Sequence, residues 1–416
     1  MAKQNVFLIM VTAENNNKFY NMVDNENGTM TVTYGRVGTP GTTKTYSIND
    51  WNKIYNSKTG KGYKDVSDSR NIKVKKEYKP LDDPEIQKLI EDLQSKSRQY
   101  MEAKYESLTV TQVMIDDAQN QLNELAKCID KDYTNDYPTW EDKDVKQLRA
   151  FNRELIELFK IIPRKMKKVE YELCRTKDDM VHKLVSEQNL LDSLKTQLKT
   201  QTPPNQASDS TILEAFNISM SKCTPEDMEI IKNAMKDLEG TSYKVKRAWV
   251  LRNNARDEEF KEYLINHSLK NDDKTVKYYW HGTRTENVFS IMVNGLQLNP
   301  SNAHITGKMF GYGIYSAPKA KKSLGYTSLS GSYWAGGSSN VGYMFLNAVI
   351  TGHKLVTESQ WKDGIYLATM DGNKFHSNFA NYHSVYARAG ANLRNDEVIV
   401  YNQGQVASRY LVEFEH

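Results

Sequence analysis

The chain has 416 residues and a mass of 47.8 kDa, which predicts roughly two to four domains at about 150 residues each. Hydrophobic residues make up 39% and charged residues 26%, so the chain can form packed cores and is not wholly disordered. No run approaches the roughly 20 apolar residues of a membrane span, and the first ten residues do not form a secretory signal. We therefore expect a protein that is neither secreted nor membrane-bound.

The cysteine content argues against disulfides and against a zinc finger. The three cysteines, Cys128, Cys174 and Cys223, are odd in number and lie far apart in the sequence. No CxxC pair occurs, which excludes a cysteine-rich zinc finger, and we expect no metal site.

The net charge of +4 is unevenly distributed along the chain. Residues 1–80 carry 13 lysines and arginines against 7 acidic residues, a net charge of +6, so the rest of the chain is slightly acidic. A polyanionic partner is therefore expected to bind the N-terminal fifth of the chain.

Residues 1–80 read as a small β-rich domain with a helix. Polar turn clusters separate short runs rich in β-branched and aromatic residues. These runs are 6–13, 18–25 and 29–37. Asp50 is expected to cap a helix that begins at Trp51.

Residues 84–200 read as a bundle of four or more helices. Apolar residues recur at helical spacing, and no glycine occurs between Gly62 and Gly240. The first such series is Ile86, Leu89, Ile90 and Leu93. The proline-containing stretch 200–210 is the clearest linker in the chain.

Residues 211–416 read as a mixed α+β domain built on a twisted antiparallel sheet. Glycines return, and strand-like runs alternate with helical ones. The strand-like runs are 247–253, 277–282, 313–317, 341–350, 397–402 and 410–415. We expect the last two to pair with each other in antiparallel fashion.

Four residues in this region carry side chains suited to chemistry. His281 ends a strand and is followed by a glycine, so that an imidazole and an open backbone can meet a ligand. Tyr315 and Tyr326 could sandwich a flat ring, and Glu397 opens a hydrophobic strand. Each has an ordinary alternative: a structural histidine, tyrosines in the core, and an acid on an edge strand.

Taken together, these residues resemble the His-Tyr-Glu triad of the poly(ADP-ribose) polymerases. The histidine stands in HGTR, the tyrosine in GYGIY and the glutamate in NDEVIVY. The similarity extends in order through HGTRTENVFSIMVNGLQL, TGKMFGYGIY, KSLGY and NDEVIVYNQGQV. The resemblance implies transfer of ADP-ribose from NAD+ with release of nicotinamide.

The resemblance also implies roles for individual residues. Glu397 would support the oxocarbenium-like transition state and promote chain elongation, and His281 would bind a ribose hydroxyl of NAD+. The remaining expected NAD+ contacts are Gly282 and Ser323 to the carboxamide, Tyr326 and Tyr315 around the nicotinamide, Arg284 and Asn287 toward the adenosine half, and Lys322 at a matching family position.

Upstream, TVTYGRVGTPG and INDWNKIYNSKTGKGY resemble a WGR domain in which Tyr34 replaces the tryptophan. The family's WGR domain recognises DNA breaks and relays that signal to the catalytic domain. The expected DNA contacts are Tyr34, Gly35, Arg36, Lys44 and Lys53. The helical bundle is similar to the family's regulatory subdomain, which would restrain NAD+ access until DNA binds.

The sequence thus predicts a multidomain α+β protein: a WGR-like DNA-binding domain at 1–80, a helical regulatory subdomain at 84–200 and an ADP-ribosyltransferase domain at 211–416. The expected function is a DNA-break-activated polymerase that modifies protein acceptors, including itself. The alternatives are a mono-ADP-ribosyltransferase acting on protein or DNA ends, and a DNA-end-binding module with a vestigial transferase domain. The expected location is the nucleus in a eukaryote, and the cytoplasm or nucleoid in a bacterial or viral setting.

Overall fold

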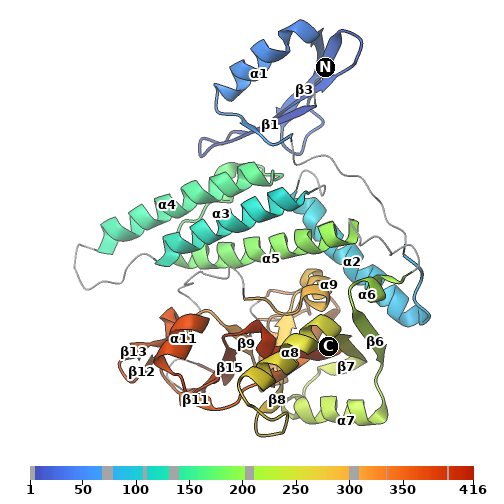
Figure 1. Cartoon of the computed structure of the whole chain (residues 1–416), viewed down its shortest axis with the longest axis vertical. Helices are drawn as coiled ribbons and strands as arrows, with labels where there is room; N and C mark the ends of the chain where they lie inside the picture. Colours follow the sequence, from blue (N-terminus) through green and yellow to red (C-terminus); the bar gives the residue numbers. More distant parts are fainter. Residues whose placement is uncertain are drawn as a thin grey trace. The chain divides into compact units, whose positions relative to one another are not determined.

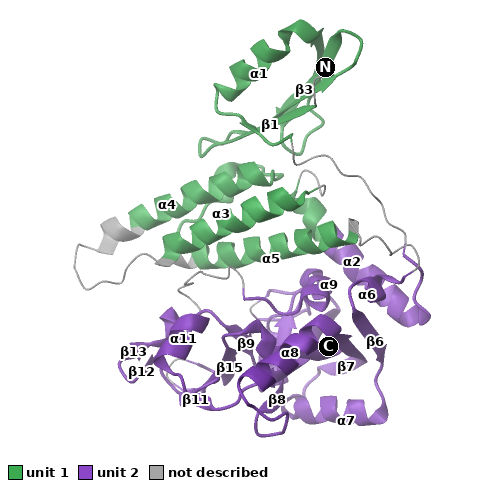
Figure 2. Ribbon diagram, viewed as in Figure 1, with its two compact units in different colours: residues 1–75, 99–202 green, residues 76–98, 203–416 purple. Residues whose placement is uncertain are grey.

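The computed structural model describes residues 5–67, 78–105, 110–130, 140–201, 210–298, 309–333, 335–390 and 393–416. Most of the predicted linker at 200–210 and the start of the TGKMFGYGIY motif lie outside these residues. The chain forms two compact units (Figure 2), one made of residues 1–75 and 99–202 and the other of residues 76–98 and 203–416. Among the described helices, none is long and apolar enough to cross a membrane.

The N-terminal unit begins with a five-stranded antiparallel sheet in the order β4-β3-β2-β1-β5. Figure 1 labels two of these strands, β1 and β3. Its elements are β1 (Val6–Val11), β2 (Asn17–Asp24), β3 (Thr29–Arg36), β4 (Thr42–Ser47), η1 (Ile48–Asp50), α1 (Trp51–Thr59) and β5 (Lys64–Asp65). The two-residue period of the strands puts Leu8, Met22 and Val32 in one core with Trp51 of α1.

The helix α1 begins at Trp51 as expected, but the predicted cap is wrong. Asp50 has helical backbone angles and its side chain makes no capping hydrogen bond. The polar side chain that caps this region belongs to Ser47, which accepts from the Asn49 N–H and starts the 3-10 turn η1. Because η1 runs directly into α1, Asp50 already lies inside a helical segment and cannot adopt the extended angles of a cap.

The same unit contains a helical bundle. Its elements are the second part of α2 (Pro84–Lys104), α3 (Gln112–Asp130), α4 (Trp140–Ile161), η3 (Val169–Tyr171) and α5 (Lys177–Gln201). Helix α3 packs against both α4 and α5. Between α4 and α5, Arg164 turns into the bundle and forms a two-pronged ion pair with Glu187, and both side chains are almost fully buried.

The C-terminal unit is built on two larger sheets. Its elements are α6 (Ile212–Ala215), β6 (Ile218–Lys222), α7 (Pro225–Ala234), η5 (Lys236–Leu238), β7 (Lys244–Asn253), α8 (Asn254–Asn266), β8 (Val276–Thr283), α9 (Thr285–Asn294), β9 (Ile314–Ser316), α10 (Ala320–Leu324), β10 (Val341–Ile350), β11 (Lys354–Thr357), β12 (Trp361–Lys362), β13 (Ile365–Tyr366), η6 (Leu367–Thr369), α11 (Gly372–Asn378), β14 (Ser384–Ala387), β15 (Glu397–Val400), η7 (Gln403–Gln405) and β16 (Val406–Glu415). The sheet orders are β6-β7-β16-β10-β8 and β11-β14-β15-β9, and β12 and β13 form a small hairpin. The mixed α+β class is therefore confirmed.

The predicted pairing of the last two strands is wrong. Strand β15 pairs with β14 and β9, whereas β16 pairs with β10 and β7, so the two strands lie in different sheets. The short connection forms the turn η7, where Asn402 and Gln405 cap each other. The buried Gln405 amide also donates to the carbonyls of Ile350 and His383. These long-range bonds direct the chain from one sheet to the other, which the short spacing between the two strands does not reveal.

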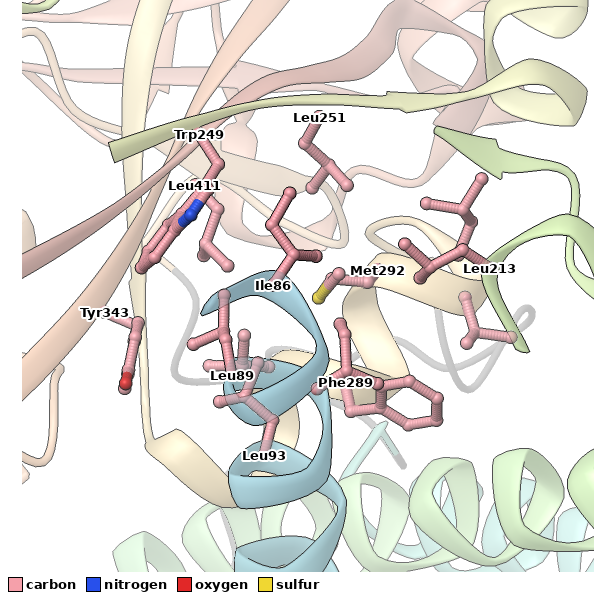
Figure 3. Packing of buried hydrophobic residues seen from close by; sticks show 14 of the residues in the cluster. Ile86, Leu89, Leu93, Leu213, Trp249, Leu251, Phe289, Met292, Tyr343 and Leu411 are labelled. Carbon is pink, nitrogen blue, oxygen red and sulfur yellow. The ribbon is translucent and has the colours of Figure 1, made fainter. Parts of the chain in front are cut away.

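The first part of α2 packs into the C-terminal unit (Figure 3). Its apolar face joins a buried cluster with strand residues such as Trp249 and with Phe289 and Met292 of α9. The α2 members of this cluster are Ile86, Leu89, Ile90 and Leu93. Residues 84–98 thus belong to the C-terminal unit, although the sequence groups them with the bundle. The boundaries proposed at 84 and 200 stay predictions.

This packing predicts that truncating Leu89 destabilises the C-terminal unit. Leu89 is buried, so Leu89→Ala should lower the free energy of unfolding by about 2–5 kcal/mol through lost burial and a residual cavity. Urea unfolding of the full chain, followed by tryptophan fluorescence, measures the change. The exposed neighbour Lys88 gives the control, and Lys88→Ala should change stability by less than about 0.5 kcal/mol. Equal losses in both variants would contradict the packing.

Candidate active site and nucleic-acid interface

The predicted triad lies at the junction of the two sheets in the C-terminal unit. Strand β8 ends the order of one sheet and β9 ends the order of the other. Trp280 of β8 and Ala317, just after β9, exchange two backbone hydrogen bonds of 2.9 Å and so join the two edges. The junction brings His281 and Gly282 next to Tyr315.

The imidazole of His281 is oriented by the backbone of β9. Its Nδ1 lies 3.0 Å from the carbonyl oxygen of Tyr315. Because a carbonyl only accepts, Nδ1 carries the proton and donates this bond. In the neutral ring Nε2 is then the acceptor, which suits a hydroxyl donor such as a ribose.

Gly282 makes the closest approach in the site. A Cβ atom at this position would lie 1.8 Å from the carbonyl oxygen of Ser323 in α10. The buried Ser323 hydroxyl donates to the Trp280 carbonyl at 3.2 Å, which also ties α10 to β8. A side chain larger than hydrogen at 282 would therefore force β8 and α10 apart.

Glu397 forms an ion pair with Lys322, and the two side chains keep only 14% and 10% of their exposure. Glu397 comes from β15, which lies inside the four-stranded sheet, so the edge-strand interpretation of this acid is wrong. Lys322 comes from α10. A buried charge is costly unless it is paired, and in this pair each side chain supplies the opposite charge that the other needs.

The Glu397 charge affects the pKa of both tyrosines, Tyr326 and Tyr315. Burial raises the pKa of Tyr326, and the Glu397 carboxylate raises it further. Burial likewise raises the pKa of Tyr315 well above its usual value, and the Tyr401 and Glu397 charges add to the effect against the opposing Phe310 N–H. Both phenols therefore stay neutral, and both lie within the electrostatic reach of the carboxylate.

The Tyr315 hydroxyl fixes the loop that precedes β9. It accepts from the Phe310 N–H at 3.1 Å and donates to the Gly311 carbonyl at 2.8 Å. Gly311 has a φ of +78°, and a Cβ there would lie 2.3 Å from the Met370 carbonyl. The Tyr315 side chain also packs against the buried cluster that contains Phe310 and Ile399, so its position next to β15 is fixed, and its role toward nicotinamide stays a prediction.

Arg284 and Asn287 lie beyond the triad, where β8 passes into α9. Arg284 donates to the carbonyl of Ala335 at 2.9 Å, and Asn287 contacts the Thr283 hydroxyl at 3.4 Å. Neither contact joins Arg284 or Asn287 to the triad. Their expected role toward the adenosine half stays a prediction.

On the N-terminal sheet, Tyr34 belongs to an aromatic and basic cluster. Its ring stacks on Tyr20 at a centroid distance of 5.6 Å and an angle of 21°. The Lys58 ammonium lies 4.2 Å from the Tyr20 centroid and 5.7 Å from the Tyr63 centroid. Burial, together with the nearby Lys61 and Lys18, lowers the pKa of Lys58. The cluster thus concentrates positive charge beside stacked rings.

The other predicted DNA contacts differ in their surroundings. Lys44 and Lys53 are exposed and can reach a phosphate. Gly35 has a packing role, because a Cβ there would lie 2.8 Å from the Gly41 Cα. Their binding of DNA stays a prediction.

Arg36 is the predicted DNA contact with the most protein partners. Its guanidinium donates to the carbonyls of Met166 and Lys167, at 3.0 and 2.6 Å, in the loop that follows α4. It also donates to the backbone carbonyl and the side-chain oxygen of Asn15. Most of its five N–H donors are therefore committed to the protein.

The sequence interpretation missed three residues that support these sites: Tyr20, Tyr63 and Asp237. Tyr20 and Tyr63 join the Tyr34 cluster, and only the register of β2 with β3, which pairs Tyr20 with Tyr34, reveals the first of them. Asp237 binds the start of α10, more than 80 residues away, and no local pattern signals it. Within the described ranges, no three His, Cys, Asp or Glu residues are placed to hold a metal ion.

Comparisons with known proteins agree with this arrangement. The family model for the poly(ADP-ribose) polymerase catalytic domain matches residues 225–416, and that for the WGR domain matches residues 4–70. Protein 101L of Invertebrate iridescent virus 6, which is uncharacterized, is 32% identical over 221 residues, covering 53% of this chain and 86% of the relative. The putative poly [ADP-ribose] polymerase-like protein 100L of the same virus is 30% identical, covering 38% of this chain and 78% of the relative. Human poly [ADP-ribose] polymerase 2 is 29% identical, covering 38% of this chain and 28% of the relative.

The fold, the triad and these matches define an ADP-ribosyltransferase that uses NAD+ as its substrate. The chain belongs to the poly(ADP-ribose) polymerase family and carries an N-terminal WGR domain ahead of its catalytic domain.

The contact between Gly282 and Ser323 predicts a large effect of one methyl group. Gly282→Ala must displace α10, and a shift of about 1 Å at a reacting site can cost about 100-fold in rate. We expect a loss of that order in NAD+ turnover, measured as nicotinamide release, with the circular dichroism spectrum retained. Gly390→Ala is the control, since a Cβ there meets nothing closer than 3.7 Å. Normal turnover in Gly282→Ala would contradict the geometry.

Proposed function

We propose that this protein is a DNA-break-activated ADP-ribosyltransferase that builds poly(ADP-ribose) on protein acceptors, itself included. The observation that carries the proposal is the bonding of Arg36, which connects the WGR sheet to the helical bundle. The triad of His281, Tyr315 and Glu397 would supply the reaction that such a connection controls.

The residues of the triad suit cleavage of the bond between nicotinamide and ribose. Nicotinamide leaves NAD+ as a neutral molecule, so the reaction needs no general acid, unlike the hydrolysis carried out by two-carboxylate glycosidases. The Glu397 carboxylate would stabilise the positive charge that develops on the ribose, and the ion pair with Lys322 would orient that carboxylate. Nε2 of His281 would accept a hydrogen bond from a ribose hydroxyl.

The nicotinamide end would be recognised by the contact region between β8 and α10. The absence of a side chain at Gly282 lets α10 lie directly against β8, and the backbone groups of Gly282 would bind the carboxamide beside this contact. The Ser323 hydroxyl adds a polar group at the same place, and Tyr326, which lies within the electrostatic reach of Glu397, would stack on the nicotinamide ring.

The DNA switch is proposed from the contacts around the loop 163–169. The buried Asn17 side chain of β2 donates to the Arg164 carbonyl at 2.8 Å, next to the two carbonyls that Arg36 holds. The side chain of the same residue, Arg164, pairs with Glu187 of α5. Movement of the WGR sheet on DNA would thus act directly on a buried ion pair of the bundle.

Because the Arg164–Glu187 pair is buried, a movement of the loop 163–169 would have a large effect on the stability of the bundle. Burial lowers the pKa of Arg164, but the Glu187 and Tyr105 charges outweigh burial and raise it overall. Removing one partner of such a pair leaves an uncompensated buried charge, which costs about 3–5 kcal/mol. A shift of the loop 163–169 that weakens the pair would therefore loosen α5. The proposed switch requires such loosening, because the bundle would restrain NAD+ access until DNA binds.

The proposed function predicts that nicked DNA stimulates the enzyme. Labelled NAD+ is incubated with the protein alone, with intact circular DNA and with nicked DNA that carries a 5′-phosphate. We expect strong labelling only with the nicked DNA. Equal labelling in all three samples would leave the transferase and overturn the DNA switch, and no labelling in any would favour a vestigial catalytic domain.

The same assay tests the role of Arg36. Arg36→Ala removes the bonds to the Met166 and Lys167 carbonyls, and we expect the stimulation by nicked DNA to fall about tenfold, within the usual range of coupling between two sites. Arg153→Ala removes an exposed arginine of α4 in the same unit and should leave the stimulation unchanged. A normal response in Arg36→Ala would exclude this route.

The polymer requires Glu397. Glu397→Gln keeps the shape but removes the charge, and the loss of one such electrostatic contact costs about 10²–10³ in rate. Gel analysis of products, with nuclease and protease controls, should show the polymer replaced by short products or none. Asp396→Asn alters the neighbouring acid, which binds the Tyr386 hydroxyl and the Ala389 N–H, and should retain the polymer. Single ADP-ribose units from the wild type would instead favour the mono-ADP-ribosyltransferase alternative.

A further inference from the structure

The short helix α10 lacks a cap of its own. It begins after Lys319, whose side chain makes no capping hydrogen bond. The N–H groups of Ala320 and Lys321 instead donate to the two oxygens of the Asp237 carboxylate, at 3.0 and 2.9 Å. Asp237 lies in η5, more than 80 residues earlier in the chain, so the cap of α10 is supplied by a distant element.

The segment that carries Asp237 also holds β8. The Ala234 carbonyl accepts from the indole N–H of Trp280 at 2.8 Å, and Trp280 immediately precedes His281. Leu238 is buried in the same apolar cluster as Trp280 and the α10 residues Ala320 and Leu324. One segment, residues 234–238, therefore binds both elements that meet at the nicotinamide end of the site.

The position of α10 sets two features of the catalytic site at once. Lys322 in this helix pairs with Glu397, and the Ser323 carbonyl fills the space where a Cβ of Gly282 would lie. A helix of five residues is too short to be stable by itself, so its orientation depends on contacts from outside. The Asp237 carboxylate is such a contact, and charge-assisted bonds to backbone N–H groups are the stronger kind.

We propose that Asp237 is a positioning residue for the NAD+ site: it holds α10 so that Ser323 lies against Gly282 and Lys322 reaches Glu397. This role rests on the NAD+ transfer proposed above and adds to it a residue that does not touch the substrate. Asp237 acts through α10, so its loss changes how well NAD+ fits rather than removing a reacting group.

The test is a comparison of KM and kcat in full-length variants with nicked DNA present. In Asp237→Ala, we expect the KM for NAD+ to rise about fivefold, the factor that corresponds to an ordinary helix cap, with a smaller fall in kcat. Asp237→Asn keeps an oxygen that can accept from one N–H and should restore most of the affinity. A purely structural role would lower the fraction of active enzyme, and so kcat, at unchanged KM.

A matched control comes from α7, the helix that precedes the Asp237 segment in the chain. Thr224 caps α7 by accepting from the Asp227 N–H, so Thr224→Ala removes a comparable cap in the same region without touching α10. We expect this variant to lose stability and to keep its KM. An equal rise of KM in both variants would overturn the positioning role, because it would reflect general loosening.

The outcomes separate this inference from the proposed function. A wild type that neither releases nicotinamide nor binds NAD+ in calorimetry would overturn the proposed function, and the positioning role with it. An active wild type with an unchanged KM in Asp237→Ala would overturn only the positioning role. Amide hydrogen exchange in residues 318–326, which needs no substrate, should be faster in Asp237→Ala, and unchanged exchange there would also overturn it.

Discussion

The catalytic site depends on the contact between the β8 backbone at Gly282 and the α10 backbone at Ser323. A hydrogen atom at 282 is what allows the two elements to approach, because a Cβ would lie 1.8 Å from the Ser323 carbonyl. The same approach lets the two sheets join through Trp280 and Ala317 and turns His281 toward the Tyr315 carbonyl. Glycine is therefore a structural requirement at this position.

The charged groups of the site come from elements that the contact between β8 and α10 helps to position. Lys322 and Glu397 come from a helix and a strand that are far apart in the sequence, and they keep little exposure. Since a buried pair is costly to break, each partner holds the other in place. The carboxylate can then face a developing cation without first losing a shell of water, which is the basis of electrostatic stabilisation in enzymes. Arg164 and Glu187 form a second buried pair, and the carbonyl of the same Arg164 accepts a hydrogen bond from Asn17 of the WGR sheet.

The sequence interpretation was wrong about the partner of one strand and did not specify the packing partner of one helix. The two C-terminal strands were expected to pair because they are close in sequence, but Gln405 is bonded to Ile350 and His383 and directs them to different sheets. The first part of α2 has the period of a bundle helix, yet its apolar face packs against Trp249 and α9. Both cases concern the choice of partner, which a repeating pattern of apolar residues does not specify.

What the sequence determined by itself is local: the strands with their two-residue period, the helices, and the motifs that carry His281, Tyr315 and Glu397. These follow from short-range backbone preferences and from residue types that stand next to each other in the chain. Only the tertiary structure decided that Lys322 neutralises Glu397, that Arg36 binds the carbonyls after α4, and that Asp237 caps α10. Each of these contacts joins residues more than 70 positions apart, and their meeting depends on how the sheets and helices pack rather than on any local signal.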